Sequence, residues 1–220
     1  MTTDAMSDRT KNSQESFIRE RLGSLLAFAP LGIWTFVHLW NNLAALKGAE
    51  AWQSSVTEYK HPIAQGLTMA IVLLPLLLHT IWGIRRLGSA RPNNLRYGFY
   101  ANLKYLLQRI SSIGVLFFIA AHLWFAFLQP RLMLGHAEQF GHIAHEMRHN
   151  LPTLAVYLLG TLGVAYHLAN GVHTFAMGWG IVRSRKALRR LEGAALGLFI
   201  LLLIMSWGSI YALWRAGGTS

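Results

Sequence analysis

The chain has 220 residues, of which 53% are hydrophobic, and its formal net charge is +11. A soluble domain rarely combines these two values, whereas a membrane protein with charged loops does so readily. The chain contains no cysteine, which excludes a disulfide, an iron–sulfur cluster held by its own thiolates, and a covalently attached c-type haem.

Residues 1–18 are polar and aperiodic, which predicts a disordered cytoplasmic tail. Five stretches without Asp, Glu, Lys or Arg follow, and each exceeds the roughly 20 residues that a helix needs to cross the hydrocarbon core. We therefore predict an all-α membrane protein, with residues 19–216 forming one five-helix bundle. The predicted spans are about 22–46, 61–84, 107–130, 152–180 and 192–214.

The positive charge segregates by connection. Fifteen Lys and Arg residues fall in the tail and in the second and fourth connections, and five fall on the other side. The positive-inside rule then places the N-terminus in the cytoplasm and the C-terminus outside. Topology alone accounts for the charge, so nucleic acid is not an expected partner, whereas anionic lipid and a docking protein are.

Four histidines, one from each of the first four stretches, follow one another at intervals of 41, 43 and 45 residues. An imidazole within a bilayer is costly and marks a functional site. With cysteine absent, four such imidazoles predict two b-type haems, each held by a histidine pair. The predicted ligands are His38, His79, His122 and His167.

Depth in the membrane predicts which histidines pair. His38 and His122 each lie nine residues before an outer charged residue, a helical rise of about 14 Å. His79 lies six residues from the inner boundary, or about 9 Å, and His167 lies past the middle of a span that runs inward. We expect an outer pair, His38 with His122, and an inner pair, His79 with His167.

Other functions use the same histidines differently. Any one of them alone could simply form a hydrogen bond between helices. A histidine-lined transporter or proton channel would favour carboxylates beside the imidazoles, and the five stretches contain none. The cytochrome b subunit of another respiratory complex also remains open.

A third alternative is a membrane zinc hydrolase that uses the third connection. There His145-Glu146-Met147-Arg148-His149 matches the HExxH zinc-protease pattern. A coincidental match is expected, because Pro152 follows at once and such a site needs a sustained helix in a cleft with a third ligand. His136 and His142 lie in the same connection.

Haem propionates are anions that prefer an arginine or a hydroxyl group at the interface. Polar side chains of these kinds lie near the predicted inner haem, and one arginine lies on the outer side. The candidates are Ser24, Arg86, Tyr105 and Arg109 inside, and Arg148 outside.

Several segments together resemble the cytochrome b558 subunit of succinate dehydrogenase, over roughly residues 19–214. They are Arg21-Leu22-Gly23-Ser24-Leu25-Leu26 running on to Val37-His38-Leu39, Leu74-Pro75-Leu76-Leu77-Leu78-His79, Leu107-Gln108-Arg109-Ile110, and His167-Leu168-Ala169-Asn170-Gly171 through Trp179-Gly180.

The resemblance implies a five-helix anchor in the bacterial cytoplasmic (inner) membrane, with two haems b on the four histidines named above. In this family, which includes dihaem fumarate reductases, a flavoprotein subunit and an iron–sulfur subunit bind the cytoplasmic face. The anchor passes electrons to or from a quinone, usually menaquinone, and performs no succinate chemistry itself. Some fumarate reductases of the family carry a glutamate for proton return two residues before the fourth ligand, where this chain has Ala165.

A quinone site needs an interfacial pocket near a haem edge and a group that exchanges protons. The outer end offers more proton acceptors than the inner end, so we place the site at the outer haem. An aromatic-belt role for the tryptophan and a solvated role for the glutamates are the alternatives. The candidate residues are Trp40, Asn41, Asn42, Glu50 and Glu58.

Overall fold

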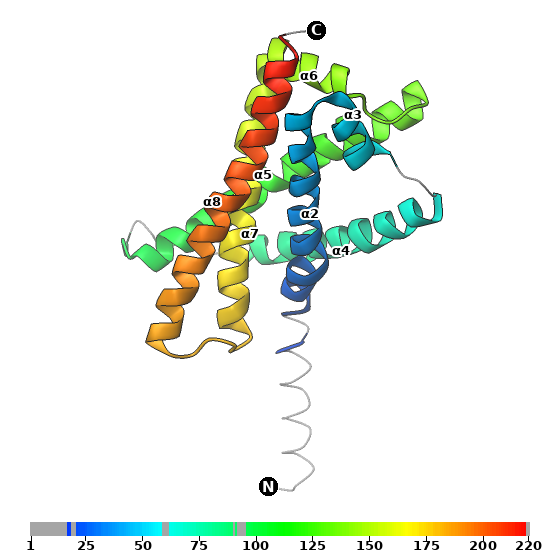
Figure 1. The fold of residues 1–220 in the computed structure, drawn as a ribbon. Helices are drawn as coiled ribbons and strands as arrows, with labels where there is room; N and C mark the ends of the chain where they lie inside the picture. Colours follow the sequence, from blue (N-terminus) through cyan, green and yellow to red (C-terminus); the bar gives the residue numbers. More distant parts are fainter. Residues whose placement is uncertain (1–16, 19–20, 59–61, 90, 92–95, 219–220) are drawn as a thin grey trace, which may run out of the picture.

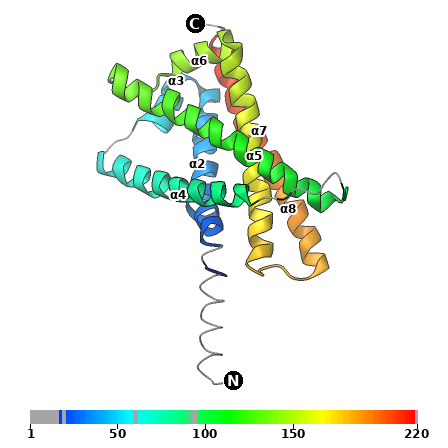
Figure 2. The ribbon, with the colours of Figure 1, turned by 180° about the vertical axis from the view of Figure 1, so that it is seen from behind.

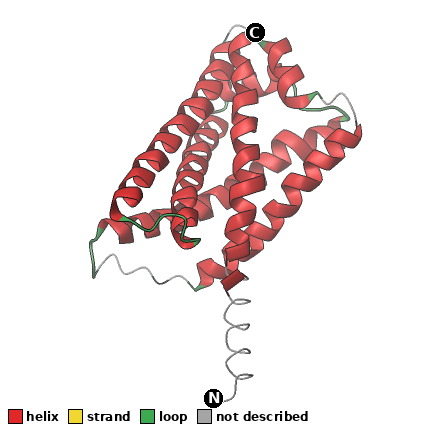
Figure 3. Cartoon of the chain, turned by 60° about the horizontal axis from the view of Figure 1, so that its bottom comes forward, coloured by secondary structure: helices red, strands yellow, loops and turns green. Residues whose placement is uncertain are grey.

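The computed structural model describes residues 17–18, 21–58, 62–89, 91 and 96–218. Within these residues the regular structure is helical, and Figure 3 draws helices joined by loops with no strand. Most of the predicted tail and His61, the first residue of the second predicted span, lie outside the described residues.

Five helical stretches are long and apolar enough to cross a membrane, which confirms the predicted number of spans. They are Arg21–Lys47, Gln65–Gly88, Tyr100–Leu134, Leu151–Gly178 and Arg185–Ala216. The third and fifth begin well before their uncharged stretches, because polar residues can continue a helix beyond the hydrocarbon core. Ser184 caps the fifth, since its Oγ accepts a hydrogen bond from the Ala187 N–H at 3.2 Å.

The first span changes its helical geometry along its length. Residues 21–26 are followed by the π-helical segment η1 (Ala27–Gly32), α2 (Ile33–Asn42) and the 3-10 segment η2 (Leu43–Lys47). Pro30 lies inside η1. Proline lacks an N–H and its ring crowds the carbonyl one turn earlier, so a wider turn accommodates it. Gly48, at φ 105°, then turns the chain into α3 (Ala49–Trp52) and η3 (Gln53–Thr57).

The second and third spans cross the others obliquely. The second span is α4 (Pro62–Gly88). The third is α5 (Tyr100–His122), extended by η4 (Leu123–Leu128) and η5 (Pro130–Leu134). Figures 1 and 2 show both helices steeply inclined to α2, α7 (Leu151–Gly178) and α8 (Arg185–Ala216). The α5 helix packs against α7, and α4 contacts η1. Their outward faces carry exposed apolar side chains such as Ile71 and Phe117, as expected for a lipid-facing surface.

A cluster of buried apolar side chains lies at the end of the molecule where α8 ends, around α6 (Phe140–His149). Phe140, Ile143, Ala144 and Met147 of this helix are buried against α3 and the last turns of α8. This segment is the connection in which the HExxH match lies. Asn150 then caps α7 by accepting the Thr153 N–H at 3.2 Å, so α6 passes directly into the fourth span.

The first span begins, and the last span ends, at opposite ends of the molecule. Figure 1 shows the blue start of the first span at the bottom and the red end of α8 at the top. A chain that crosses a membrane an odd number of times has its two termini on opposite sides. The orientation with the N-terminus inside rests on the charge distribution alone.

Candidate functional site

The four intramembrane histidines lie in two pairs, and each member comes from a different helix. The rings of His38 in α2 and His122 at the end of α5 have centroids 6.0 Å apart, with their planes at 70°. Those of His79 in α4 and His167 in α7 lie 6.3 Å apart at 65°. These are the two pairs expected from depth.

The spacing within each pair fits one metal ion between the rings. A metal–imidazole bond is about 2 Å long. Two imidazoles on opposite sides of one ion therefore hold their ring centroids roughly 6 Å apart, by the same bond length. Both pairs have this separation, so they fit bis-histidine ligation of a haem iron. Ligation itself stays a prediction.

Close packing holds the first ligand of the inner pair. The Nδ1 of His79 lies 2.9 Å from the backbone oxygen of Gly23. When Nδ1 donates its proton to that carbonyl, Nε2 is left free to bind iron. The Trp82 ring packs beside His79 at 5.7 Å. A Cβ atom on Gly23 would lie 2.1 Å from that ring, so only glycine allows this approach.

Polar side chains of α5 and α7 surround the other inner ligand. The Gln108 amide lies 3.2 Å from His167 Nδ1, and Ser111 Oγ lies 3.5 Å from it. Asn170 Nδ2 donates to Gln108 Oε1 at 2.7 Å. The same Gln108 NH2 group also donates to the His167 backbone oxygen at 3.2 Å, so hydrogen bonds on both sides fix this amide beside the imidazole. No pattern in the sequence marks Gln108 or Asn170 as a neighbour of a ligand.

Aromatic rings enclose the outer pair. Trp34 stacks on His38 with centroids 4.6 Å apart, and Phe118 stacks on His122 at 5.7 Å. The Tyr157 hydroxyl lies 3.3 Å from His122 Nδ1. Asn42 Nδ2 donates to the His38 backbone oxygen at 2.8 Å. It also lies 3.4 Å from His38 Nε2, a contact that iron bound at Nε2 would replace.

Arg109 has the feature expected of a propionate ligand. Its guanidinium lies 4.9 Å above the Tyr105 ring, and its Nε atom is buried without a hydrogen-bond partner among the described residues. A buried cationic donor without a partner is costly and favours an anion nearby. Because Arg109 follows Gln108, the neighbour of His167, a carboxylate of an inner haem fits this position.

The other predicted propionate contacts have protein partners. Ser24 Oγ donates to the Arg21 backbone oxygen at 2.6 Å and accepts the Trp179 indole N–H at 3.2 Å. The Arg86 guanidinium lies 5.1 Å above Trp82. Arg148 lies 3.9 Å above the Trp214 ring, where α6 meets α8. Their propionate role stays a prediction.

The predicted quinone residues separate into three places. Glu50 and Glu58 line an open pocket of about 490 Å³ together with Gln53 and Phe140. Asn42 turns toward the outer pair and accepts the Trp52 indole N–H at 3.2 Å. Trp52 in turn packs against Phe140 of the pocket lining, with ring centroids 5.8 Å apart. Trp40 is 63% exposed, as a membrane-interface residue would be, and Asn41 is half-buried.

The HExxH residues serve the packing of α6. Glu146 Oε2 accepts hydrogen bonds from Asn150 Nδ2 at 2.8 Å and Thr153 Oγ1 at 3.2 Å. The His149 Nε2 lies 3.2 Å from the Gly217 backbone oxygen. These contacts occupy the glutamate and one histidine of the motif at the junctions of α6 with α7 and α8.

The fold and the site together define a multi-pass membrane protein in which four helices carry two facing histidine pairs. No protein-family model matches the chain. The chain is similar to the succinate dehydrogenase cytochrome b558 subunit of Bacillus subtilis strain 168. The two are 29% identical over 206 residues, a match that covers 91% of this chain and 98% of that protein. The resemblance expected from the sequence motifs is thereby confirmed.

Proposed function

We propose that the chain is the dihaem cytochrome b anchor of a succinate:quinone oxidoreductase, or of a quinol:fumarate reductase, in a bacterial cytoplasmic membrane. The observation that carries the proposal is the pair of histidine sites with ring centroids 6.0 and 6.3 Å apart. The similarity to a succinate dehydrogenase cytochrome b558 subunit along nearly its whole length supports the assignment to this kind of complex.

The chain would bind and position two haems, which supply one-electron transfer when bound. The four imidazoles hold the irons. The Gly23 carbonyl and the Gln108 amide orient the inner ligands, and Arg109 neutralises a propionate. The resemblance implies electron transfer between the iron–sulfur subunit and membrane quinone, usually menaquinone, and this chain would hold the inner and the outer haem between them.

The proposed partners, a flavoprotein subunit and an iron–sulfur subunit, dock on the cytoplasmic face. Exposed basic side chains at the inner ends of α4 and α8 support this placement. They are Arg85, Arg86, Arg183, Arg185, Lys186, Arg189 and Arg190. Such a face attracts acidic protein surfaces and anionic lipid alike.

A reduced-minus-oxidised visible spectrum of the purified complex tests the proposal. We expect two b-type haems per chain and copurification with succinate dehydrogenase activity. Two haems with a different enzyme activity would identify the cytochrome b of another respiratory complex. A chain without haem would favour the transporter or channel alternative.

Reporter fusions test the proposed orientation. Truncation fusions after Arg91 and Arg189 should report the cytoplasm, because basic connections remain inside. Fusions at Glu50, at Gly141 and at the C-terminus should report the outer side. If the other fusions report as expected, a C-terminal fusion that reports the cytoplasm would contradict the count of five spans.

Substitution of the pocket carboxylates tests the quinone site. The double variant Glu50→Gln, Glu58→Gln should slow quinone-linked turnover by about tenfold, because both proton acceptors of the pocket are lost. Succinate oxidation with an artificial acceptor should persist. Glu192→Gln, which removes an exposed carboxylate of α8, is the control. The outer site would be excluded by two results together: normal quinone turnover in the double variant, and a quinone-site inhibitor that perturbs only the inner haem.

A further inference from the structure

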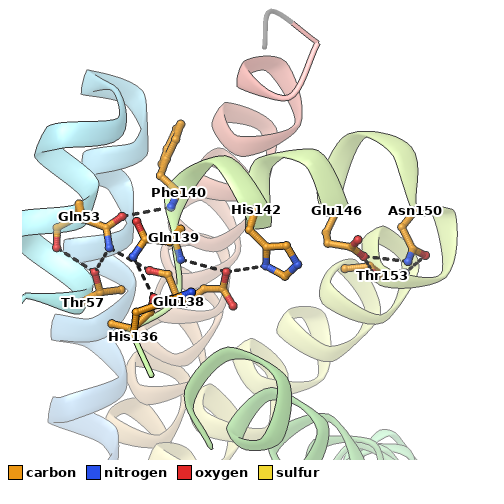
Figure 4. A network of polar contacts seen from close by, with 11 residues as sticks. Gln53, Thr57, His136, Glu138, Gln139, Phe140, His142, Glu146, Asn150 and Thr153 are labelled. Carbon is orange, nitrogen blue, oxygen red and sulfur yellow. Dashed lines mark hydrogen bonds and ion pairs between the residues drawn. The ribbon is translucent and has the colours of Figure 1, made fainter. Parts of the chain in front are cut away.

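The segment before α6 buries a carboxylate at the outer end of the molecule. Glu138 is only 5% exposed. One of its oxygens, Oε1, accepts hydrogen bonds from His142 Nδ1 at 2.7 Å and from the Gln139 backbone N–H at 3.1 Å, as Figure 4 shows. Burying a carboxylate is costly even when it is paired, and this one belongs to neither the predicted haem contacts nor the predicted quinone residues.

Glu138 lies directly behind the wall of the outer pocket. Gln53, which lines that pocket, donates from Nε2 to the Glu138 backbone oxygen at 2.9 Å. Its Oε1 accepts the Phe140 N–H at 3.1 Å. The next two residues, Gln139 and Phe140, also line the pocket. The backbone of Glu138 is therefore tied to the lining of the space where we place the quinone, and its carboxylate turns toward His142.

Glu138 reaches solvent through its hydrogen-bond partner His142. The His142 side chain is 62% exposed, so its imidazole exchanges protons with the outer medium. On the membrane side, Tyr157 packs against the same cluster of buried side chains as Phe140, and its hydroxyl lies 3.3 Å from His122 Nδ1. By contrast, Glu50 and Glu58 are exposed carboxylates on the open side of the pocket.

We propose that Glu138 and His142 form a second proton-exchange group of the outer quinone site, beside Glu50 and Glu58, an inference that rests on the proposed function. Reduction of a quinone to a quinol takes two electrons, which arrive through the haems, and two protons. For each proton, the Glu138 carboxyl group gives up its hydrogen and becomes a carboxylate. The His142 imidazolium then protonates it and recovers its own proton from the outer solvent. Quinol oxidation runs through the same steps in reverse.

The variant Glu138→Gln removes the proton carrier and keeps the size and an oxygen acceptor of the side chain. Quinone-linked turnover should fall at least about tenfold, which is the lower end of what proton-transfer groups contribute. Both haem bands and succinate oxidation with an artificial acceptor should remain. Glu138→Asp, which restores a carboxyl group, should recover part of the lost turnover.

His142→Ala provides an independent measurement, because the exposed position is accessible to small molecules. Quinone-linked turnover should fall by several fold and recover when imidazole is added to the medium. His136→Ala is the matched control. His136 is an exposed histidine of the same segment, and its Nδ1 lies 2.8 Å from the Ala137 backbone oxygen. We expect normal turnover from this control and no response to imidazole.

Full quinone turnover in Glu138→Gln with both haems present would overturn the proposal, and so would a His142→Ala defect that imidazole does not repair. If Glu138→Gln lost the outer haem, the His142→Ala variant would decide. Rescue of its turnover by imidazole would support the proposal, and no rescue would overturn it. Failure of the proposed function is recognised separately, because the unsubstituted complex would then lack haem or quinone-linked activity.

Discussion

His38→Ala and His122→Ala should each remove the same haem, the outer one, and leave the spectrum of the inner haem in place. The two rings face each other at 6.0 Å, and loss of either imidazole leaves the iron with one axial ligand. His79→Ala and His167→Ala should have the converse effect, because these rings face each other at 6.3 Å. Low-temperature difference spectra of membranes, with potentiometric titration to separate the two components, would provide the measurement.

His173→Ala is a suitable control for this series. His173 is a buried histidine of α7, 4% exposed, and lies near Glu192 of α8, with 3.9 Å between His173 Nε2 and Glu192 Oε1. Its removal should leave both haems bound. The pairing would be wrong if His38→Ala and His79→Ala abolished the same spectral component.

The five spans and the grouping of the histidines could be predicted from the sequence for clear physical reasons. Charged residues are excluded from the hydrocarbon core, so their absence marks each span. A fixed rise per residue converts the position of His38 or His122 within a span into depth. When two of the four histidines lie at one depth and two at another, depth alone determines which histidines can pair.

The third connection has the apolar spacing of an amphipathic helix, which predicts α6. Phe140, Ile143, Ala144 and Met147 follow the i, i+3, i+4, i+7 spacing of a buried helical face, and all four are buried. The histidines between them directed attention to metal chemistry. The structure shows that Glu146 and His149 join α6 to its neighbours.

The surroundings of the ligands and the inclination of the helices could not be predicted. A polar residue such as Gln108 or Tyr157 within a span has no pattern that identifies its partner, because that partner lies on another helix. A carboxylate such as Glu138 in a connection is most simply expected in solvent. Helix inclination depends on packing against neighbouring helices, which the length of an apolar stretch does not determine.

Two glycines should control the two haems separately. A Cβ atom on Gly23 would lie 2.1 Å from the Trp82 ring, and one on Gly160 would lie 2.1 Å from the Phe118 ring. Real atoms do not approach so closely, and an indole or phenyl ring packed between helices cannot yield as the end of a flexible side chain can. In each case the helices must move apart or the ring must turn.

Gly23→Ala should therefore break the 2.9 Å contact between the Gly23 carbonyl and His79 Nδ1 and weaken or abolish the inner haem alone. Gly160→Ala should displace Phe118 from its stacking on His122 and affect the outer haem alone.

The controls are Gly83→Ala in α4 and Gly114→Ala in α5, where an added Cβ meets nothing within 4 Å. Alanine there should preserve both haems and favour the helix by up to about 1 kcal/mol. Haem content and the two redox components of each variant, measured after equal expression, provide the comparison. If Gly23→Ala and Gly160→Ala retained both haems, or lost the same one, these close approaches would not be what positions each ligand.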